Sequence, residues 1–246
     1  MKKPVELPFM NVRDIVLFPE AYQQLYIGRT FTIEAIKSAL KSKTKAHRGK
    51  IIVITQKAVQ KEKPLSKADM FSVGTICQIE NSVMLSDGTM KVLLRGEQVL
   101  LIKSITDHDG VRLARGTPFA TRSLKQKLPD SEKREVLGLL LRWNPEIAID
   151  DDEERFDLLK KETKLSDFIS TISGLISFLR PEEKKNVAAL KKRHIGVGSL
   201  AYASCKKLKT VNGRIKKRQL LLEEVSQSKQ LRLIKEILNE EIHSRF

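Results

Sequence analysis

The sequence predicts an α+β protein in which a β-rich region is followed by a helical region. In the first half, apolar residues come in short β-branched or alternating runs, which are typical of strands. In the second half they recur about every 3.6 positions, as they do on one face of a helix. A loop rich in Gly, Pro, Ser and Lys, 115–129, separates the two patterns. We therefore expect domains at 1–118 and 124–246.

Several runs of the first half predict strands. The stretch 7–20 carries an Arg13-Asp14 pair between two apolar runs and contains Pro19 near its end. We expect a bend or bulge at the pair and a strand end at the proline. Further strands are expected at 51–55, 73–80, 90–94 and 99–105. Ser86-Asp87-Gly88 lies between two of these runs and predicts a hairpin, so a small, partly closed barrel or a sandwich fits the pattern.

One helix is expected among the strands, starting near 30–36. Thr30 or Thr32 can cap its first turn. The residues that share its apolar face are Phe31, Ala35 and Ala39.

The second half predicts helices throughout. Ser131 precedes a helix over 132–142, and Asn144-Pro145 ends it. From 199 to 246 the periodicity is interrupted only near Gly213, which predicts one long helix, or two helices joined near that glycine. The apolar residues along one face of this helix need another apolar surface to pack against. Self-association of the chain through this helix is therefore a hypothesis.

The composition restricts the class of protein. The formal charge of +16 at pH 7 favours polyanionic or acidic partners and does not bear on the fold. No run of about 18 apolar residues is present, and the first residues lack the apolar core of a signal peptide. No membrane segment is therefore expected. Cys77 and Cys205 form neither a C-x-x-C motif nor a disulfide framework, which favours a reducing, cytoplasmic location.

No catalytic or metal-binding constellation stands out in the sequence. The four histidines have no other ligating residue at metal-ligand spacing, so neither a metal nor a cofactor is expected. Ser38 and Ser204 each begin an S-x-x-K match, but the supporting motifs of penicillin-binding enzymes are missing. The acidic run 150–154 suits the first turn of a helix, where negative charge is favourable.

The segment 184–218 holds 12 Lys or Arg residues and no Asp or Glu. An ordinary solvent-exposed helix face mixes the two signs, so this segment predicts a basic stripe that contacts a polyanion. The residues of the predicted stripe are Lys191, Lys192, Arg193, Lys206, Lys207, Lys209, Arg214, Lys216, Lys217 and Arg218. DNA, RNA and an acidic protein all fit the pattern, and a merely charged face also explains it.

Five ordered blocks in the first hundred residues resemble the N-terminal domain of Lon proteases. The first is LPFMNVRDIVLFP at 7–19, in which the Arg13-Asp14 pair and Pro19 fill the family pattern. The other blocks are FTIEAI at 31–36, IIVITQK at 51–57, DMFSVGTICQI at 69–79 and LSDGTMKVLLRG at 85–96. EVSQS at 224–228 is similar to the region that leads into the Lon ATPase. The following residues depart from the family, and neither a Walker A loop nor a Ser-Lys proteolytic domain follows.

The resemblance implies a PUA-like pseudo-barrel in a non-enzymatic region that binds unfolded or degron-bearing polypeptides, whereas ATP-dependent proteolysis would belong to a parent protein. The apolar residues expected to contact such polypeptides are Phe9, Met10, Leu17, Phe18, Tyr22 and Tyr26. The chain is either a fragment of a full Lon protease or a stand-alone regulator of the same fold. A basic nucleic-acid-binding protein is the alternative, because PUA-like barrels can bind RNA and Lon proteases bind DNA.

Overall fold

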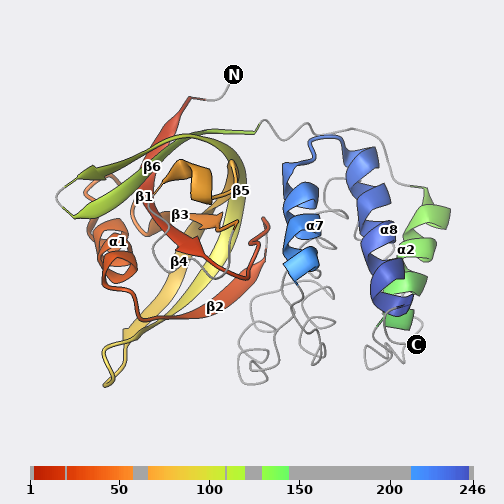
Figure 1. Ribbon diagram of the computed structural model, residues 1–246, viewed down its shortest axis with the longest axis horizontal. Helices are drawn as coiled ribbons and strands as arrows, with labels where there is room; N and C mark the ends of the chain where they lie inside the picture. Colours follow the sequence, from red (N-terminus) through yellow and green to blue (C-terminus); the bar gives the residue numbers. More distant parts are fainter. Residues whose placement is uncertain are drawn as a thin grey trace. The chain divides into compact units, whose positions relative to one another are not determined.

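A computed structural model describes residues 3–19, 21–57, 66–108, 110–119, 129–143 and 212–243 (Figure 1). The chain divides into two compact units. The first unit is Met1–Thr121 together with Asn212–Glu223, and the second is Arg122–Val211 together with Glu224–Phe246. A β-rich N-terminal sheet and helices towards the C-terminus confirm the predicted α+β class.

The described residues of the first unit form six strands and two α-helices. In chain order they are β1 Val5–Val12, β2 Tyr22–Ile27, α1 Thr30–Lys41, β3 Lys50–Thr55, β4 Val73–Met84, β5 Met90–His108, β6 Val111–Pro118 and α7 Asn212–Glu223, with a short 3-10 turn, η1, at Lys67–Asp69. The second unit contains α2 Asp130–Trp143 and α8 Gln227–His243. The predicted strands at 90–94 and 99–105 are thus parts of one long strand, β5.

The six strands form one sheet that closes on itself. Their order is β2-β5-β4-β3-β1-β6, with an additional pairing between β5 and β6. The closure is possible because β5 has 19 residues: its first part pairs with β2 and β4, and its last part pairs with β6. All pairs are antiparallel except β1 with β3. Only β2 therefore stands at an end of the described sheet.

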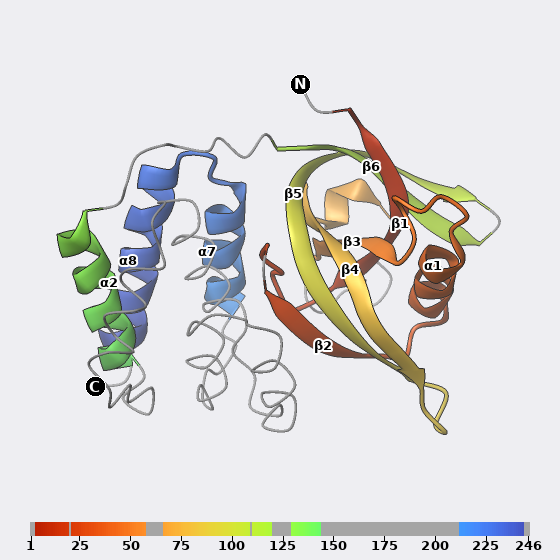
Figure 2. The ribbon, with the colours of Figure 1, turned by 180° about the vertical axis from the view of Figure 1, so that it is seen from behind.

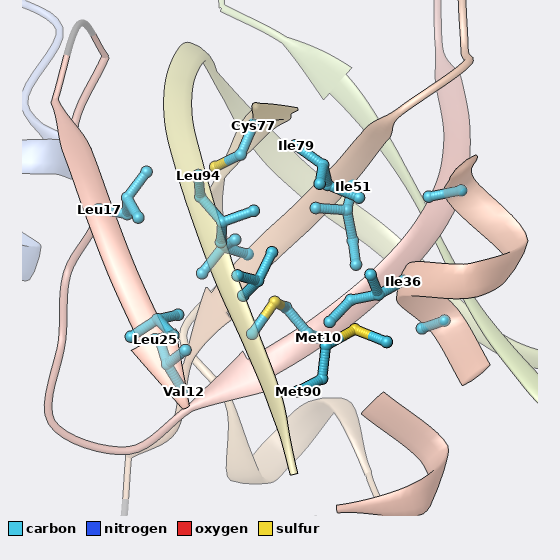
Figure 3. Packing of buried hydrophobic residues seen from close by; sticks show 14 of the residues in the cluster. Met10, Val12, Leu17, Leu25, Ile36, Ile51, Cys77, Ile79, Met90 and Leu94 are labelled. Atoms are coloured by element: carbon cyan, nitrogen blue, oxygen red, sulfur yellow. The ribbon is translucent and has the colours of Figure 1, made fainter. Parts of the chain in front are cut away.

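The apolar core lies on both faces of the sheet. Along β1, Leu7 and Phe9 belong to one buried cluster, whereas Met10 and Val12 belong to another. The second cluster lies beneath α1, where Ile36 meets side chains from β1, β3 and β5 (Figure 3). This alternation is what the strand period of two residues requires.

The chain bends at Arg13 and Asp14, as the sequence predicts. β1 ends at Val12, and the segment that follows it is held across the sheet by two threonines. Thr55 Oγ1 donates a hydrogen bond to the carbonyl oxygen of Ile15 at 2.7 Å, and Thr75 Oγ1 donates to that of Leu17. The stretch 7–19 therefore contains a strand, the predicted bend and a crossing segment that is not part of a strand.

The start of α1 differs from the prediction. Its N-cap is Arg29, which makes no side-chain capping hydrogen bond, and the amides of Thr32 and Ile33 donate to the Arg29 carbonyl oxygen. The helix therefore begins at Thr30, so both predicted caps lie inside it. Its buried face consists of Thr32, Ile33, Ala35, Ile36 and Ala39, while Phe31 is only partly buried.

The C-terminal region is not one continuous helix in its described part. The break lies at 224–226, between α7 and α8, and not near Gly213, which falls inside α7. At the break the Ser226 amide donates to Glu224 Oε1 at 2.7 Å, and the Ser226 carbonyl accepts the first bond of α8 from Gln230. At the break, these two hydrogen bonds take the place of backbone bonds that a continuous helix would make. Residues 199–211 lie outside the described part.

The two helices also belong to different units. Gln219 of α7 hydrogen-bonds β4 in the first unit, whereas in the second unit Lys235 of α8 pairs with Glu135 of α2 at 2.7 Å. The domain limits 1–118 and 124–246 stay a prediction, because 144–211 lies outside the described residues.

Candidate functional site

Three adjacent strands, β2, β5 and β4, place exposed and half-buried side chains side by side. In the register, Tyr26 lies opposite Lys91, and Lys91 lies opposite Val83. Cross-strand partners share one face of a sheet, as do residues two apart on one strand. The next row adds Gln24, Leu93 and Asn81 to the same face. We call this surface the outer face, and its residues are Gln24, Tyr26, Asn81, Val83, Lys91 and Leu93.

The outer face combines apolar surface with a positive charge. Tyr26 is 57% exposed and Val83 is 50% exposed. Lys91 Nζ lies 5.8 Å from the centroid of the Tyr26 ring, within the range of a cation–π contact. Gln24 Nε2 donates a hydrogen bond to Tyr26 Oη at 3.2 Å. These contacts hold the ring in position, and exposed apolar surface of this kind commonly marks a binding site.

Four of the six residues predicted to contact a polypeptide are buried. Phe9, Met10, Leu17 and Phe18 are each no more than 3% exposed. Phe9 and Met10 are successive residues of β1 and belong to the clusters on its two faces, whereas Leu17 lies after the bend and packs in the same cluster as Met10. These four side chains therefore serve packing, and their assignment as contact residues is corrected.

The two tyrosines of the predicted set lie on β2. Tyr26 belongs to the outer face, and Tyr22 is half-buried next to Arg95, its register partner. Val83, Lys91 and Leu93 were not among the residues predicted from the sequence. A signal for them was present: a hairpin turning at 85–89 requires β4 to run beyond Glu80 in order to pair with the strand that starts at Met90.

Beside the outer face, Arg95 is held between two carboxylates. Its Nε lies 2.6 Å from Glu80 Oε1 and its Nη2 lies 3.0 Å from Glu97 Oε1, while Lys50 pairs with Glu97 at 2.9 Å. Burial alone would lower the pKa of Arg95, but the hydrogen bond and charge of Glu80 and the charge of Glu97 outweigh it and raise that pKa. The cluster is charge-balanced and rigid, so it supports the sheet beside the face.

An open cavity of about 360 Å³ lies at the end of the sheet where β1 and β3 begin. Its lining residues are Val5, Leu7, Ala46, His47, Lys50, Ile76, Glu97 and Gln98. The charged pair on its wall, Lys50 and Glu97, is already an ion pair. The cavity therefore offers an apolar floor without a charge that selects a ligand.

The predicted basic stripe is only partly described. Lys191, Lys192, Arg193, Lys206, Lys207 and Lys209 lie outside the described residues, as does the side chain of Arg214. On α7, Lys216 is exposed and Lys217 is partly buried, but Arg218 is only 6% exposed. Three consecutive helical residues point in different directions, so these three do not form one exposed stripe.

Within the described ranges, no group of three or more His, Cys, Asp or Glu residues is placed to hold a metal ion. Cys77 is a buried free thiol whose pKa is raised well above its usual value, first by burial and then by the charge of Glu97. Among the described helices, none is long and apolar enough to cross a membrane.

A family model described as the ATP-dependent protease La (LON) substrate-binding domain matches residues 6–240. The chain belongs to this family. The resemblance seen in the five sequence blocks is thereby confirmed, and the chain is a Lon-type substrate-binding domain by family.

Curated relatives agree with this assignment. The Lon protease of Nitratidesulfovibrio vulgaris is 41% identical over 91 residues, which is 37% of this chain and 10% of that protein. The Lon protease of Escherichia coli is 30% identical over 131 residues, 53% of this chain and 15% of that protein. The chain thus spans a small part of these relatives' length.

Solved Lon domains share the fold. The N-terminal domain of a Mycobacterium avium complex Lon protease superposes with a TM-score of 0.57 at 17% identity, covering 96% of this chain and 98% of that one. A Lon N-terminal domain protein from Xanthomonas campestris gives 0.54 at 14% identity, covering 93% and 95%.

Proposed function

We propose that this Lon-type domain is a non-catalytic recognition region that binds unfolded or degron-bearing polypeptides through its outer face. The observation that carries the proposal is the row of Tyr26, Lys91 and Val83 on three adjacent strands. Tyr26 supplies aromatic area, Val83 supplies aliphatic area, and both are at least half exposed. Tyrosine is enriched where binding energy concentrates in interfaces.

The rigidity of the outer face supports this role. The opposite side of β2 and β5 is anchored in the core by Leu25, Val92 and Leu94, each no more than 6% exposed. The face is thus presented by a packed sheet rather than by a loop, and a preformed surface loses less conformational entropy on binding. In a parent protease, such a region would hold a polypeptide near the ATPase, whereas a stand-alone protein of this fold would act as a regulator.

The proposal is tested by fluorescence anisotropy of a labelled, permanently unfolded polypeptide titrated with the protein at about 50 and about 200 mM salt. Apolar capture should persist or strengthen at the higher salt. Binding that fails at both salt concentrations contradicts the proposal.

Nucleic-acid binding is the second candidate, and the observation in its favour is the +16 charge of the chain. Titration of labelled single- and double-stranded DNA under the same two conditions tests it, since binding through several phosphates should fall steeply with salt. Self-association through the C-terminal helices, a PUA-like classification of the closed sheet and a cytoplasmic location stay predictions.

A further inference from the structure

The far half of β4 is an edge of the sheet. Pairing of β4 with β3 ends at Gln78, and the Ile79 amide donates the last bond on that side, to the Gly49 carbonyl at 2.7 Å. Within the described ranges, the strand from Asn81 to Met84 pairs only with β5. In Figures 1 and 2, β2 runs along the β5 side of this hairpin, where it pairs with Met90–Arg95, so among the described residues the open side is that of β4.

The direction of the backbone groups on this edge follows from the register. The Leu85 amide donates to the Thr89 carbonyl at 2.8 Å, so this pair is hydrogen-bonded. Hydrogen-bonded and non-hydrogen-bonded pairs alternate in an antiparallel ladder. The Val83–Lys91 pair, two residues further along, is then also hydrogen-bonded. Ser82 and Met84 belong to non-hydrogen-bonded pairs, so their N–H and C=O groups point away from β5.

The side chains beside these groups are apolar and exposed. Val83 and Met84 are each 50% exposed, on opposite faces of the strand. Protein edges are usually protected by lysine, proline or an inward-pointing charge, and the sequence Asn81-Ser82-Val83-Met84 contains none of these. This edge is therefore built to accept a partner rather than to exclude one.

We propose that the Asn81–Met84 edge binds an extended segment of an unfolded polypeptide as an added strand. The exposed groups specify this occupant, because alternating donors and acceptors about 7 Å apart match only another extended main chain. Main-chain pairing does not depend on the partner's side chains, as a site for unfolded chains of varied sequence requires. Val83 belongs to both the edge and the outer face, so one segment can use both.

The inference rests on the proposed function. A variant at Ser82 tests strand addition separately from polypeptide binding as such. Ser82→Pro removes an outward N–H without removing a bond of the β4–β5 ladder, and Ser82→Ala is the matched control. Anisotropy with a labelled apolar, unfolded peptide should show binding weakened at least about tenfold by Ser82→Pro and less than about twofold by Ser82→Ala.

A second measurement uses the unaltered protein, so it holds even if Ser82→Pro does not fold. Two versions of the peptide carry backbone N-methyl groups on alternate residues, one on the odd and one on the even positions. An added strand directs only one set of amides at the edge, so one version should lose at least about tenfold in affinity and the other little.

Three results contradict parts of this account in different ways. Equal binding of Ser82→Pro and of both methylated peptides overturns strand addition and leaves the proposed function standing. Absence of binding of the parent peptide to the unaltered protein overturns both. A peptide-free dimer in analytical ultracentrifugation that Ser82→Pro dissociates assigns the edge to a second copy and overturns the inference.

Discussion

Gln219 Nε2 donates a hydrogen bond at 3.0 Å to the carbonyl oxygen of Val73, a residue 146 positions earlier in the chain. This bond joins α7 to the start of β4, and Gln219 itself is only 1% exposed. The same nitrogen lies 3.1 Å from Glu223 Oε1. A helix that is remote in sequence thus belongs to the β-rich unit.

Gln219→Leu should destabilise the first unit by about 1–3 kcal/mol, because the variant leaves the Val73 carbonyl without this buried donor. Urea unfolding followed by circular dichroism measures the loss. Lys216→Ala is the control, since Lys216 is exposed on the same helix and should change stability by less than about 0.5 kcal/mol. Equal effects of the two variants would contradict the anchoring role of Gln219.

Phe9→Ala should mainly reduce stability, whereas Tyr26→Ala should mainly weaken polypeptide binding. Phe9 is 1% exposed, so its truncation should cost about 3–5 kcal/mol of unfolding free energy through a core cavity. Tyr26→Ala should cost less than about 1 kcal/mol but weaken polypeptide binding. Urea denaturation measures the stability of both variants, and fluorescence anisotropy measures their polypeptide binding. A stable Phe9→Ala protein with a specific binding defect would restore Phe9 as a contact residue.

Gly96→Ala should destabilise the protein by more than about 2 kcal/mol. A Cβ at Gly96 would collide with the backbone carbonyl of Phe18, where the crossing segment passes over β5, and backbone cannot yield as a flexible side chain does. Gly28→Ala is the matched control, because its Cβ would meet only Thr89 Cγ2 at 3.7 Å, an ordinary contact. Thermal unfolding of both variants measures the difference, and equal melting temperatures would contradict this packing.

Stability should fall in alkaline solution because of Cys77. Burial raises the pKa of the folded thiol above its value in the unfolded chain. The stabilisation is therefore complete below the unfolded pKa, near 8.5, and is lost as pH rises above it, by at most about 1.4 kcal/mol per pH unit. Urea unfolding between about pH 8 and pH 10 should show this slope, and Cys77→Ala should reduce it. An unchanged slope in Cys77→Ala would contradict the assignment.

The sequence was sufficient for the fold class, for β1 and β3, for the hairpin at Ser86-Asp87-Gly88 and for the bend at Arg13. Each depends on local rules: alternation, turn chemistry and charge between apolar runs. It was insufficient for the place of α7, which belongs to the β-rich unit and is joined to β4 by the long-range bond from Gln219 to Val73. Sequence periodicity alone carries no information on such a contact.

The site was harder to predict than the fold for a similar reason. Phe9 looks like a binding residue by type, and only the closure of the sheet through β5 and β6 shows that both sides of β1 are covered. Phe18, which lies after the bend, is likewise only 2% exposed. Tyr26, Lys91 and Val83 come from three separate stretches, and strand register alone brings them together. Candidate residues on a sheet surface therefore require the register before they can be chosen.

The central claim is most directly tested by the double variant Tyr26→Ala/Val83→Ser, with Leu40→Ala as the control at an exposed apolar position outside the outer face. Each protein is titrated into a labelled, permanently unfolded polypeptide at about 200 mM salt. We expect the double variant to bind at least about tenfold more weakly, equivalent to about 1.4 kcal/mol, and Leu40→Ala to bind like the unaltered protein. Unchanged affinity in a correctly folded double variant would contradict polypeptide recognition by the outer face.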